Sequence, residues 1–453
     1  MSQQTFEEAI AEYVERCHES VGKEREEGHP PGPGTPYPIG EPPYEAAIKF
    51  DERTIRNYAL SIGNTNPLFV DPEYGKHTSY GSMLAPNTAL ILVRSPGGQG
   101  PTRPEGYPVG DFFSGLAWEF FDVIRAGDGR FKNTKKTSEF FEKTGSRGRL
   151  LFLIEEIKYW NAHADLVGKC YGTLILVPIE SMGAGRAMNV DRLGESLMYD
   201  RATSRYSEEQ IEEYVLQMKS SKRRGSTPLF WEDVKIGDKL GPLVVPPFTL
   251  LDQTVQRVVS GAATGRYGTS GDELAFEPVY RHNREGKGGY GKGFSHPITR
   301  WPHGPGDEHS DALMAAYRGQ PGPFDGGQHR SQLPHVLISD WMSDDGFIRR
   351  YQCALRKPVY YGDTTFYEGE VVNKFKEIQE GDDTSGGRSG KVEYCAVGIK
   401  LEGKNQVGEV QMQGAITVYL PSQEGGQVRL PIPHKGNSPY VPYERFYRDW
   451  YRG

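Results

Sequence analysis

The chain has 453 residues, which is enough for two or three domains that each bury a core. Its formal net charge of −7, with acidic and basic residues well mixed, argues against a nucleic-acid partner. No stretch approaches the roughly 18 consecutive apolar residues that a membrane span needs. The four cysteines form no CxxC pair and the acidic N-terminus lacks the apolar segment of a signal peptide, so we expect a soluble, cytoplasmic protein with structural thiols.

Similar segments occur in the same order in the two halves of the chain. An amphipathic helical run at residues 50–63, "FDERTIRNYALSIG", corresponds to "FTLLDQTVQRVVSGAATG" at 248–265. Each run is followed by a more apolar helical segment, at 81–95 and at 326–341. The Gly-Asp turns "VIRAGD" and "PVYYGD" come next, and pairs of long alternating runs follow at 148–177 and 390–420. The layout is therefore an internal duplication.

This order predicts an α+β fold with two copies of one unit, a double hotdog. In each unit a long antiparallel sheet wraps around a central apolar helix, because the apolar face of the sheet must be covered. The predicted parts are an N-terminal helix with a Pro-rich linker at 1–43, a first hotdog at 44–181, a linker with a helix capped at Ser207 at 182–226, a second hotdog at 227–421, and an aromatic tail at 422–453. We expect the tail to pack on the body or on a partner chain.

Two segments carry a resemblance to a known family. "YALSIGNTNPLFVDPEYG" at residues 58–75, followed by "YGSMLAP", resembles the MaoC-like hydratase and dehydratase family. The typical loop of that family reads Tyr-Ala-x-x-Ser-Gly-Asp-x-Asn-Pro-x-His-x-Asp. "PFDGGQHRSQLPHVLISDW" at 323–341 resembles the C-terminal hotdog of two-domain acyl dehydratases in the same family. The resemblance covers most of residues 44–420.

The resemblance implies a lyase that acts on acyl thioesters. In the family an Asp, and a His five positions later, activate a water that adds to C3 of a trans-2-enoyl thioester, and dehydration is the reverse reaction. In the first half of this chain Asn64 stands at the Asp position and Phe69 at the His position. An amide can position a water but cannot take a proton, and a phenyl ring can do neither. We therefore expect Asn64 and Phe69 to bind substrate, in a first hotdog that holds the acyl chain without catalysing.

The second half also departs from the family loop. Arg266 stands where the Asp is expected, and no Asn-Pro follows. Glu277 and His282 reproduce the acid-to-His spacing of five, and Asp272 is a second candidate for the acid. We predict catalytic roles for these three residues and a substrate contact for Arg266. The alternative, that they are ordinary surface residues, stays open.

The start of each central helix is predicted to bind the thioester. Gly81 in the first half, and Gly326 or Gly327 in the second, stand where a backbone N–H could hold the enolate-like oxygen. The alternative is that these glycines only permit a turn. His329 would face the thioester as a catalytic group, and Arg330 would hold an acidic substrate group or a CoA phosphate. The alternative for this pair is that both are exposed polar residues at a helix start.

The second half also contains an insertion. The Gly-Asp turns lie 235 residues apart and the helix ends 202, so about 33 residues have been added, around residues 282–312. This Gly-rich stretch with several histidines is predicted to be a lid or substrate loop. Its spacings fit no compact metal motif, so we expect neither metal nor cofactor, with the CoA thioester as substrate.

The leading hypothesis is an enoyl-CoA hydratase, or a dehydratase of a 3-hydroxyacyl thioester. Three alternatives remain: a non-catalytic acyl-thioester-binding subunit, a hotdog thioesterase, and a dehydratase of a substrate without a thioester. One chain already supplies the two hotdogs that one-domain relatives bring together by dimerising. A homo-oligomer built on an isologous contact remains compatible with this arrangement.

Overall fold

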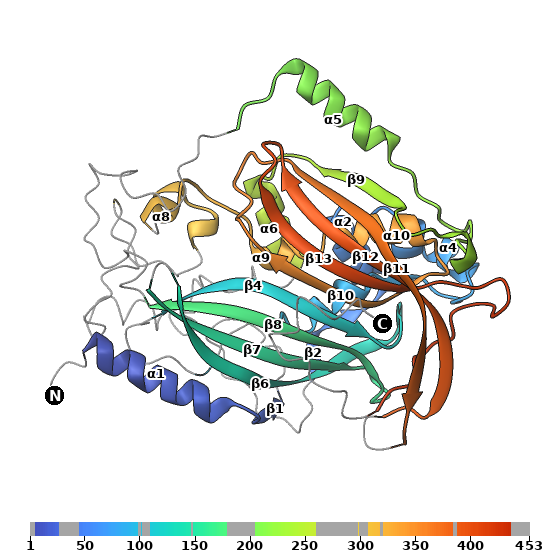
Figure 1. Cartoon of the computed structure of the whole chain (residues 1–453), viewed down its shortest axis with the longest axis horizontal. Helices are drawn as coiled ribbons and strands as arrows, with labels where there is room; N and C mark the ends of the chain where they lie inside the picture. The colour runs from blue at the N-terminus through green and yellow to red at the C-terminus, as the bar shows by residue number, and fades with distance from the viewer. Residues whose placement is uncertain are drawn as a thin grey trace.

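In the computed structural model, the described residues are 5–26, 45–97, 101, 109–145, 148–178, 204–259, 298, 307–317, 320–383 and 387–435. They form one large antiparallel sheet of eleven strands, with short helices on it and a separate two-stranded pair. The strands of the first half and those of the second lie side by side in this sheet (Figure 1). The predicted α+β class is confirmed.

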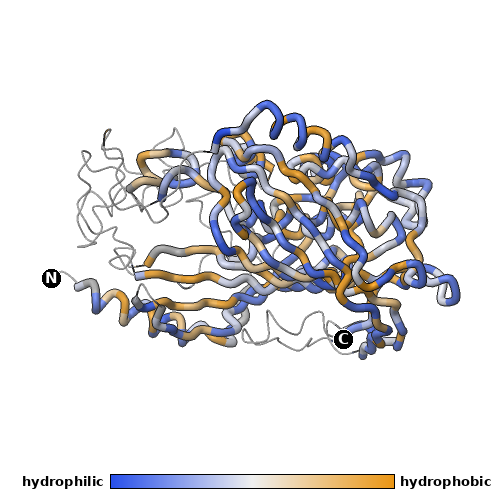
Figure 2. Tube along the Cα trace, turned by 45° about the horizontal axis from the view of Figure 1, so that its top comes forward, coloured by the Kyte–Doolittle hydropathy of each residue, from blue (hydrophilic) through white to orange (hydrophobic). Residues whose placement is uncertain are grey.

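The first half begins with a helix that covers one end of its sheet. Its elements are α1 (Phe6–Ser20), β1 (Glu24–Glu26), β2 (Glu45–Phe50), α2 (Glu52–Ser61), α3 (Pro67–Val70), α4 (Pro72–Lys76), β3 (Leu84–Ala85), the 3-10 helix η1 (Asn87–Leu92), β4 (Val109–Phe120), β5 (Ile124–Arg125), β6 (Gly129–Gly145), β7 (Gly148–Trp160) and β8 (Leu166–Pro178). Along α1, polar and apolar residues alternate (Figure 2), and Ile10, Tyr13 and Cys17 face a small core with β7 and β8.

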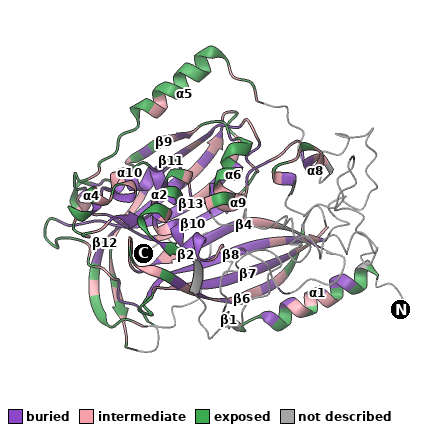
Figure 3. Ribbon diagram, turned by 180° about the vertical axis from the view of Figure 1, so that it is seen from behind, coloured by how far each residue is buried: buried purple, intermediate pink, exposed green. Residues whose placement is uncertain are grey.

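The second half follows an exposed helix, α5 (Glu208–Ser220), which begins after Ser207 as predicted and has no buried residues (Figure 3). The remaining elements are η4 (Trp231–Asp233), β9 (Lys239–Val245), α6 (Leu250–Val259), η7 (Asp307–His309), α8 (Ala312–Tyr317), α9 (Gly327–Arg330), α10 (Pro334–Met342), β10 (Phe347–Leu355), β11 (Thr365–Gly381), β12 (Gly390–Asn405) and β13 (Val410–Tyr419). Among the described residues, no helix has both the length and the apolar character to cross a membrane.

The strand order confirms the duplication. From the centre outward, the first half runs β4, β8, β7, β6 and β2, and the second runs β10, β13, β12, β11 and β9. The halves join where β4 pairs with β10, from Gly115 opposite Ala354 to Glu119 opposite Arg350. Each of these five strands thus has its counterpart at the same position in the other half, whereas β1, β3 and β5 have none in the described part of the second half. This is the predicted double hotdog.

The two Gly-Asp turns have the same geometry. Gly127 and Gly362 adopt left-handed φ angles of 99° and 90°, which a glycine accepts without strain. The next residue, Asp128 or Asp363, accepts a hydrogen bond from the backbone N–H three residues earlier, at 2.8 and 3.1 Å. The turns therefore mark equivalent points of the two copies.

The central helices differ from the prediction. The segment at 81–95 does not form one helix, because β3 pairs with β5 and only Asn87–Leu92 forms a 3-10 helix. Pro86 explains the late start, since proline has no N–H to donate and disfavours helical geometry at the residue before it. In the second half the predicted central helix is divided into the short α9 and α10, and Pro334 takes the first position of α10.

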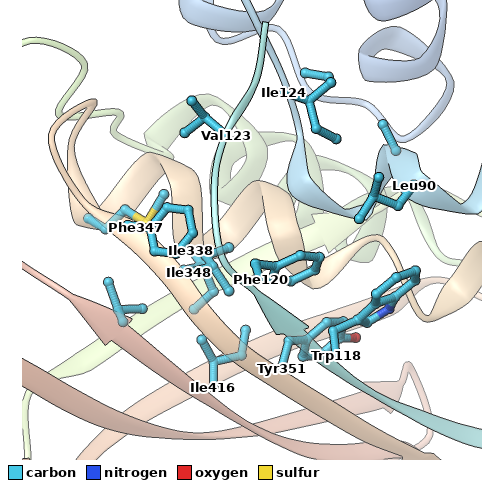
Figure 4. Close-up of a cluster of buried hydrophobic side chains, with 14 of the residues drawn as sticks. Leu90, Trp118, Phe120, Val123, Ile124, Ile338, Phe347, Ile348, Tyr351 and Ile416 are labelled. Atoms are coloured by element: carbon cyan, nitrogen blue, oxygen red, sulfur yellow. The ribbon is translucent and has the colours of Figure 1, made fainter. Parts of the chain in front are cut away.

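The main core runs through both halves without interruption. Leu90, Trp118, Phe120, Val123 and Ile124 of the first half belong to the same buried cluster as five side chains of the second half, which are Ile338, Phe347, Ile348, Tyr351 and Ile416 (Figure 4). The described halves therefore pack as one body, and the first-half loop at 62–76 lies against helix α10.

Candidate functional site

The first-half loop has the local structure that its sequence predicts. Asn66 caps α3, its Oδ1 accepting from Leu68 N at 3.0 Å, and Pro67 takes the first helical position. Asp71 caps α4 in the same manner, with Oδ1 accepting from Glu73 N at 2.9 Å, and Pro72 follows. These two caps hold the loop in a tight path and leave Asn64 and Phe69 pointing into the protein.

Asn64 contacts the helix of the other half. Its side chain is fully buried, and its Oδ1 accepts a hydrogen bond from Asn66 N at 3.0 Å. Its Nδ2 donates to Ser339 Oγ at 3.1 Å and lies 3.5 Å from His335 Nδ1. The residue at the family's Asp position thus contacts the second half.

His335 lies where the loop and α10 meet. It is 2% exposed, and its ring packs edge-on against Phe69 with the ring centroids 5.5 Å apart. Burial lowers the pKa of His335 to about 3, so the imidazole is neutral at ordinary pH. His335 was not among the residues predicted from the sequence, because one histidine in an apolar helix usually belongs to the core.

A second pair of polar residues crosses between the halves beside this contact. The hydroxyl of Tyr58, on α2, hydrogen-bonds Gln332 Oε1 and also Thr88 Oγ1, the latter at 2.9 Å. Gln332 Nε2 donates to Gln328 O at 2.7 Å. Burial raises the pKa of Tyr58 well above its ordinary value, so the phenol keeps its proton. We call the residues of both contacts the interhalf polar seam: Tyr58, Asn64, Gln332, His335 and Ser339.

The structure places His329 between the ends of two helices. Its Nε2 donates to Ser61 O at the end of α2, at 3.2 Å, and its ring lies 6.4 Å from that of Phe248 before α6. Burial lowers the pKa of His329. The side chain is therefore neither exposed nor positively charged at neutral pH. Its predicted catalytic role stays a prediction.

Arg330 is held inside the second half. Its Nε lies 3.0 Å from Asp325 Oδ2, and its NH1 donates to Gln411 O at 3.0 Å and to Lys357 O. The residue is 5% exposed, so the alternative of an exposed polar side chain is wrong. These contacts fix the guanidinium group between α9 and the sheet, which does not support the predicted contact with a CoA phosphate.

Comparisons with known proteins agree with this architecture. Residues 39–169 match the family model described as "FAS1-like, dehydratase domain region". A solved structure of a MaoC-like dehydratase aligns with 90% of this chain and 100% of its own, with a TM-score of 0.53 and 14% identity. The chain has the double hotdog fold of the MaoC-like dehydratases.

Two further relatives are more distant or shorter. A conserved hypothetical protein from Mycobacterium tuberculosis, described as having a double hotdog fold, is 10% identical, and the alignment covers 82% of this chain and 93% of that one with a TM-score of 0.43. A "UPF0336 protein" from Thermobifida fusca (strain YX) is 32% identical over 103 residues. That match spans 22% of this chain and 57% of the length of the relative.

The glycines of this MaoC-like fold differ in their surroundings. The N–H of Gly326 donates to Gln253 Oε1 at 3.2 Å, whereas the N–H groups of Gly327 and Gln328 donate to no other described residue. A Cβ on Gly327 would lie 2.4 Å from Leu355 Cδ1, so a larger residue at this position would require the Leu355 side chain to move. Gly81 precedes η1 by six residues and donates its N–H to Thr78 O at 3.1 Å, so it has the turn role.

Four predicted residues, Arg266, Asp272, Glu277 and His282, lie outside the described residues. The same holds for most of the insertion and for the aromatic tail beyond residue 435. Within the described part of the chain, no three His, Cys, Asp or Glu side chains gather where they could hold a metal ion.

The described site can donate hydrogen bonds but is poorly suited to proton transfer near neutral pH. Asn64 and Phe69 do not titrate there, and burial keeps His335 neutral and Tyr58 protonated. The described side chains around the first-half loop therefore include no acid–base pair, and the substrate-binding role predicted for Asn64 and Phe69 stays a prediction.

Proposed function

We propose that the protein is a hydro-lyase that adds water to an enoyl thioester, or removes it from a 3-hydroxyacyl thioester, with CoA as the carrier. The observation that carries this proposal is the double hotdog fold of a MaoC-like dehydratase together with the dehydratase-region match at residues 39–169. The fold retains the loop and the helix starts that thioester chemistry uses, even where the acid and base have changed.

In this proposal the two halves divide the work. The first-half loop binds, because Asn64 and Phe69 replace the proton-transferring pair. The second-half loop then supplies the acid and base, with Glu277 or Asp272 and His282 as candidates by their spacing. The N–H groups of Gly327 and Gln328, which donate to no described residue, support a role for this helix start in binding the thioester.

The test follows the thioester and the thiol together. Wild-type protein, His282→Ala and Glu277→Gln are incubated with crotonyl-CoA, while the absorbance of the conjugated thioester and the release of free thiol are recorded. His163→Ala, in an exposed turn of the first half, is the matched control. We expect the absorbance to fall without thiol release in the wild type and the control. In the two variants the rate of this fall should be at least a hundredfold lower, which is the range for loss of an acid–base group.

A second candidate function is a non-catalytic acyl-thioester-binding subunit. The neutral His335 and the amide of Asn64 favour it, because this site shows binding groups without a proton carrier. Saturable binding of crotonyl-CoA without any change in absorbance would support this function and refute the lyase. Thiol release would instead indicate a thioesterase, and absence of binding would indicate a substrate without a thioester.

A further inference from the structure

The orientation of the Asn64 amide is determined by its surroundings. Its oxygen faces the N–H of Asn66, at 3.0 Å, which can only donate. The Nδ2 group must therefore face α10, where Ser339 Oγ and His335 Nδ1 lie within reach at 3.1 and 3.5 Å. The two hydrogens of one amide nitrogen serve these two acceptors, because the Ser339 hydroxyl already donates to Val336 O at 3.1 Å.

This orientation selects one tautomer of His335. An amide N–H can only donate, so Nδ1 is the accepting nitrogen of the ring. In a neutral imidazole the proton then resides on Nε2. An aspartate at position 64 would demand the opposite arrangement, since a carboxylate accepts and would place the proton on Nδ1. Asparagine at this position thus makes the ring a donor at Nε2 and not a base.

The Nε2–H of His335 has no partner among the described residues. The atom is fully buried and the whole residue is 2% exposed, with Phe69 against the ring. A buried donor that lacks a partner has lost its hydrogen bonds to water without replacing them, so such groups in native proteins nearly always face an acceptor. The acceptor must be uncharged or weakly charged, because burial keeps the imidazole neutral and no cation of the seam would balance an anion.

We propose that Asn64 and His335 form a neutral hydrogen-bond donor site, in which Nε2–H binds an uncharged oxygen acceptor, either the carbonyl oxygen of an acyl thioester or a water molecule that takes its place. Asn64 is a positioning residue that sets the tautomer, and His335 makes the contact. The carbonyl alternative rests on the proposed function, whereas the donor itself rests on geometry alone. Where the family loop carries an Asp, this loop carries Asn64, and the hydrogen-bond donor at the site is His335 of the second half.

The first experiment measures the tautomer without any substrate. Full-length protein with ¹⁵N-histidine is examined by NMR at pH 7, and the ring of His335 is assigned from the signals lost in His335→Gln. We expect a neutral ring protonated on Nε2, with a slowly exchanging N–H. A ring protonated on Nδ1, a charged ring, or an Nε2–H that exchanges as fast as a solvent-exposed one would overturn the proposal.

The second experiment separates the two acceptors. Butyryl-CoA labelled with ¹³C at the thioester carbonyl cannot be hydrated, so its bound carbonyl stretch reports hydrogen bonding without turnover. If the carbonyl is the acceptor, the stretch moves to lower frequency in wild type, keeps most of that shift in His335→Gln, whose amide retains a donor, and loses it in His335→Phe. Circular dichroism confirms that each variant is folded.

Each remaining outcome has a defined meaning. If the carbonyl stretching frequency is equal in wild type and His335→Phe, and wild type shows a cross-relaxation signal between Nε2–H and water, the donor site is supported with water as the acceptor. An equal stretch without that water signal overturns the proposal. If butyryl-CoA does not bind at all, the proposed function fails and the carbonyl alternative with it, while the tautomer measurement still decides whether the donor exists.

Discussion

At the scale of single residues, Asn64 of the first-half loop contacts a residue that lies far away in the sequence. Asn64 and His335 are 271 positions apart and meet only because the two halves pack together. The substitution of an amide for a carboxylate and of Phe69 for a histidine leaves a site that can donate hydrogen bonds. Loss of the acid and the base in this loop is therefore compatible with a retained binding role.

The charge at position 64 should control the ionisation of His335. In Asn64→Asp the carboxylate would face Nδ1, which favours the protonated ring and raises the pKa of His335 above its value of about 3. The buried carboxylate should also lower the free energy of unfolding by about 1–3 kcal/mol. Asn64→Leu, which removes the same hydrogen bonds without adding charge, is the control. NMR titration should show a shifted pKa only in Asn64→Asp, and an unchanged titration would contradict the assigned contact.

Buried neutral histidines should make stability depend on pH. The pKa of His335 is about 3 in the folded chain, while an unfolded histidine titrates near 6.5. Below about pH 6.5, the unfolded chain therefore binds a proton that the folded chain does not bind. The free energy of unfolding should then fall as the pH decreases, by about 1.4 kcal/mol per pH unit for this one group. His329, whose pKa is also lowered, acts in the same direction.

Urea unfolding at pH 7, 6 and 5 measures this dependence. Between pH 7 and pH 5, the free energy of unfolding of His335→Gln should fall less than that of the wild type. The variant lacks one of the buried histidines that take up a proton only on unfolding. His163→Ala, in an exposed turn, should keep the wild-type dependence. Equal slopes for wild type and His335→Gln would show that the imidazole is accessible to protons in the folded state.

At the scale of helices, strands and turns, most of the architecture could be predicted from periodicity and repeated order. The helical runs at α2 and α6, the Gly-Asp turns and the long alternating strands are local patterns, and the structure confirms them. The central helix of the first half was predicted wrongly because Pro86 and the pairing of β3 with β5 override an apolar helical pattern. His335 could not be selected, since its role depends on a contact across the whole chain.

Close packing at the start of α9 should make Gly327 the sensitive member of an adjacent glycine pair. A Cβ at Gly327 would meet Leu355 Cδ1 at 2.4 Å, whereas one at Gly326 would meet nothing closer than 3.8 Å. Gly327→Ala should therefore lower the free energy of unfolding by about 1–3 kcal/mol, as overpacking does, while Gly326→Ala should be nearly neutral. Thermal unfolding of both variants is the measurement, and equal effects would mean that Leu355 moves aside freely.

At the scale of the whole molecule, the two halves share one sheet, one core and one set of charges. Glu119 on β4 lies 3.7 Å from Arg350 Nε and 3.9 Å from Arg349 NH2, so a carboxylate of the first half meets two guanidinium groups of the second. Burial acts to lower the pKa of Arg350, but its hydrogen bonds and ion pair with Glu377, together with smaller charge effects, outweigh burial and raise the pKa. These contacts, the core of Figure 4 and the interhalf polar seam join the two described halves in one body.

The two halves should therefore unfold together as one cooperative unit, and a destabilising substitution at the β4–β10 junction should lower the stability of both halves equally. Gly115→Ala would place a Cβ 2.4 Å from Cys353 O across the β4–β10 pair, where only a backbone shift could relieve it. Gly369→Ala, inside the second half, meets only side chains at 3.2–3.4 Å and is the control. Native-state hydrogen exchange, read by mass spectrometry, should give the same opening free energy for the slowest amides of β7 and of β12 in the wild type. In Gly115→Ala this opening free energy should fall by the same amount in both strands. If the amides of β7 lost protection while those of β12 kept it, the halves would be separate folding units, and a binding site built across them would need their docking as an additional step.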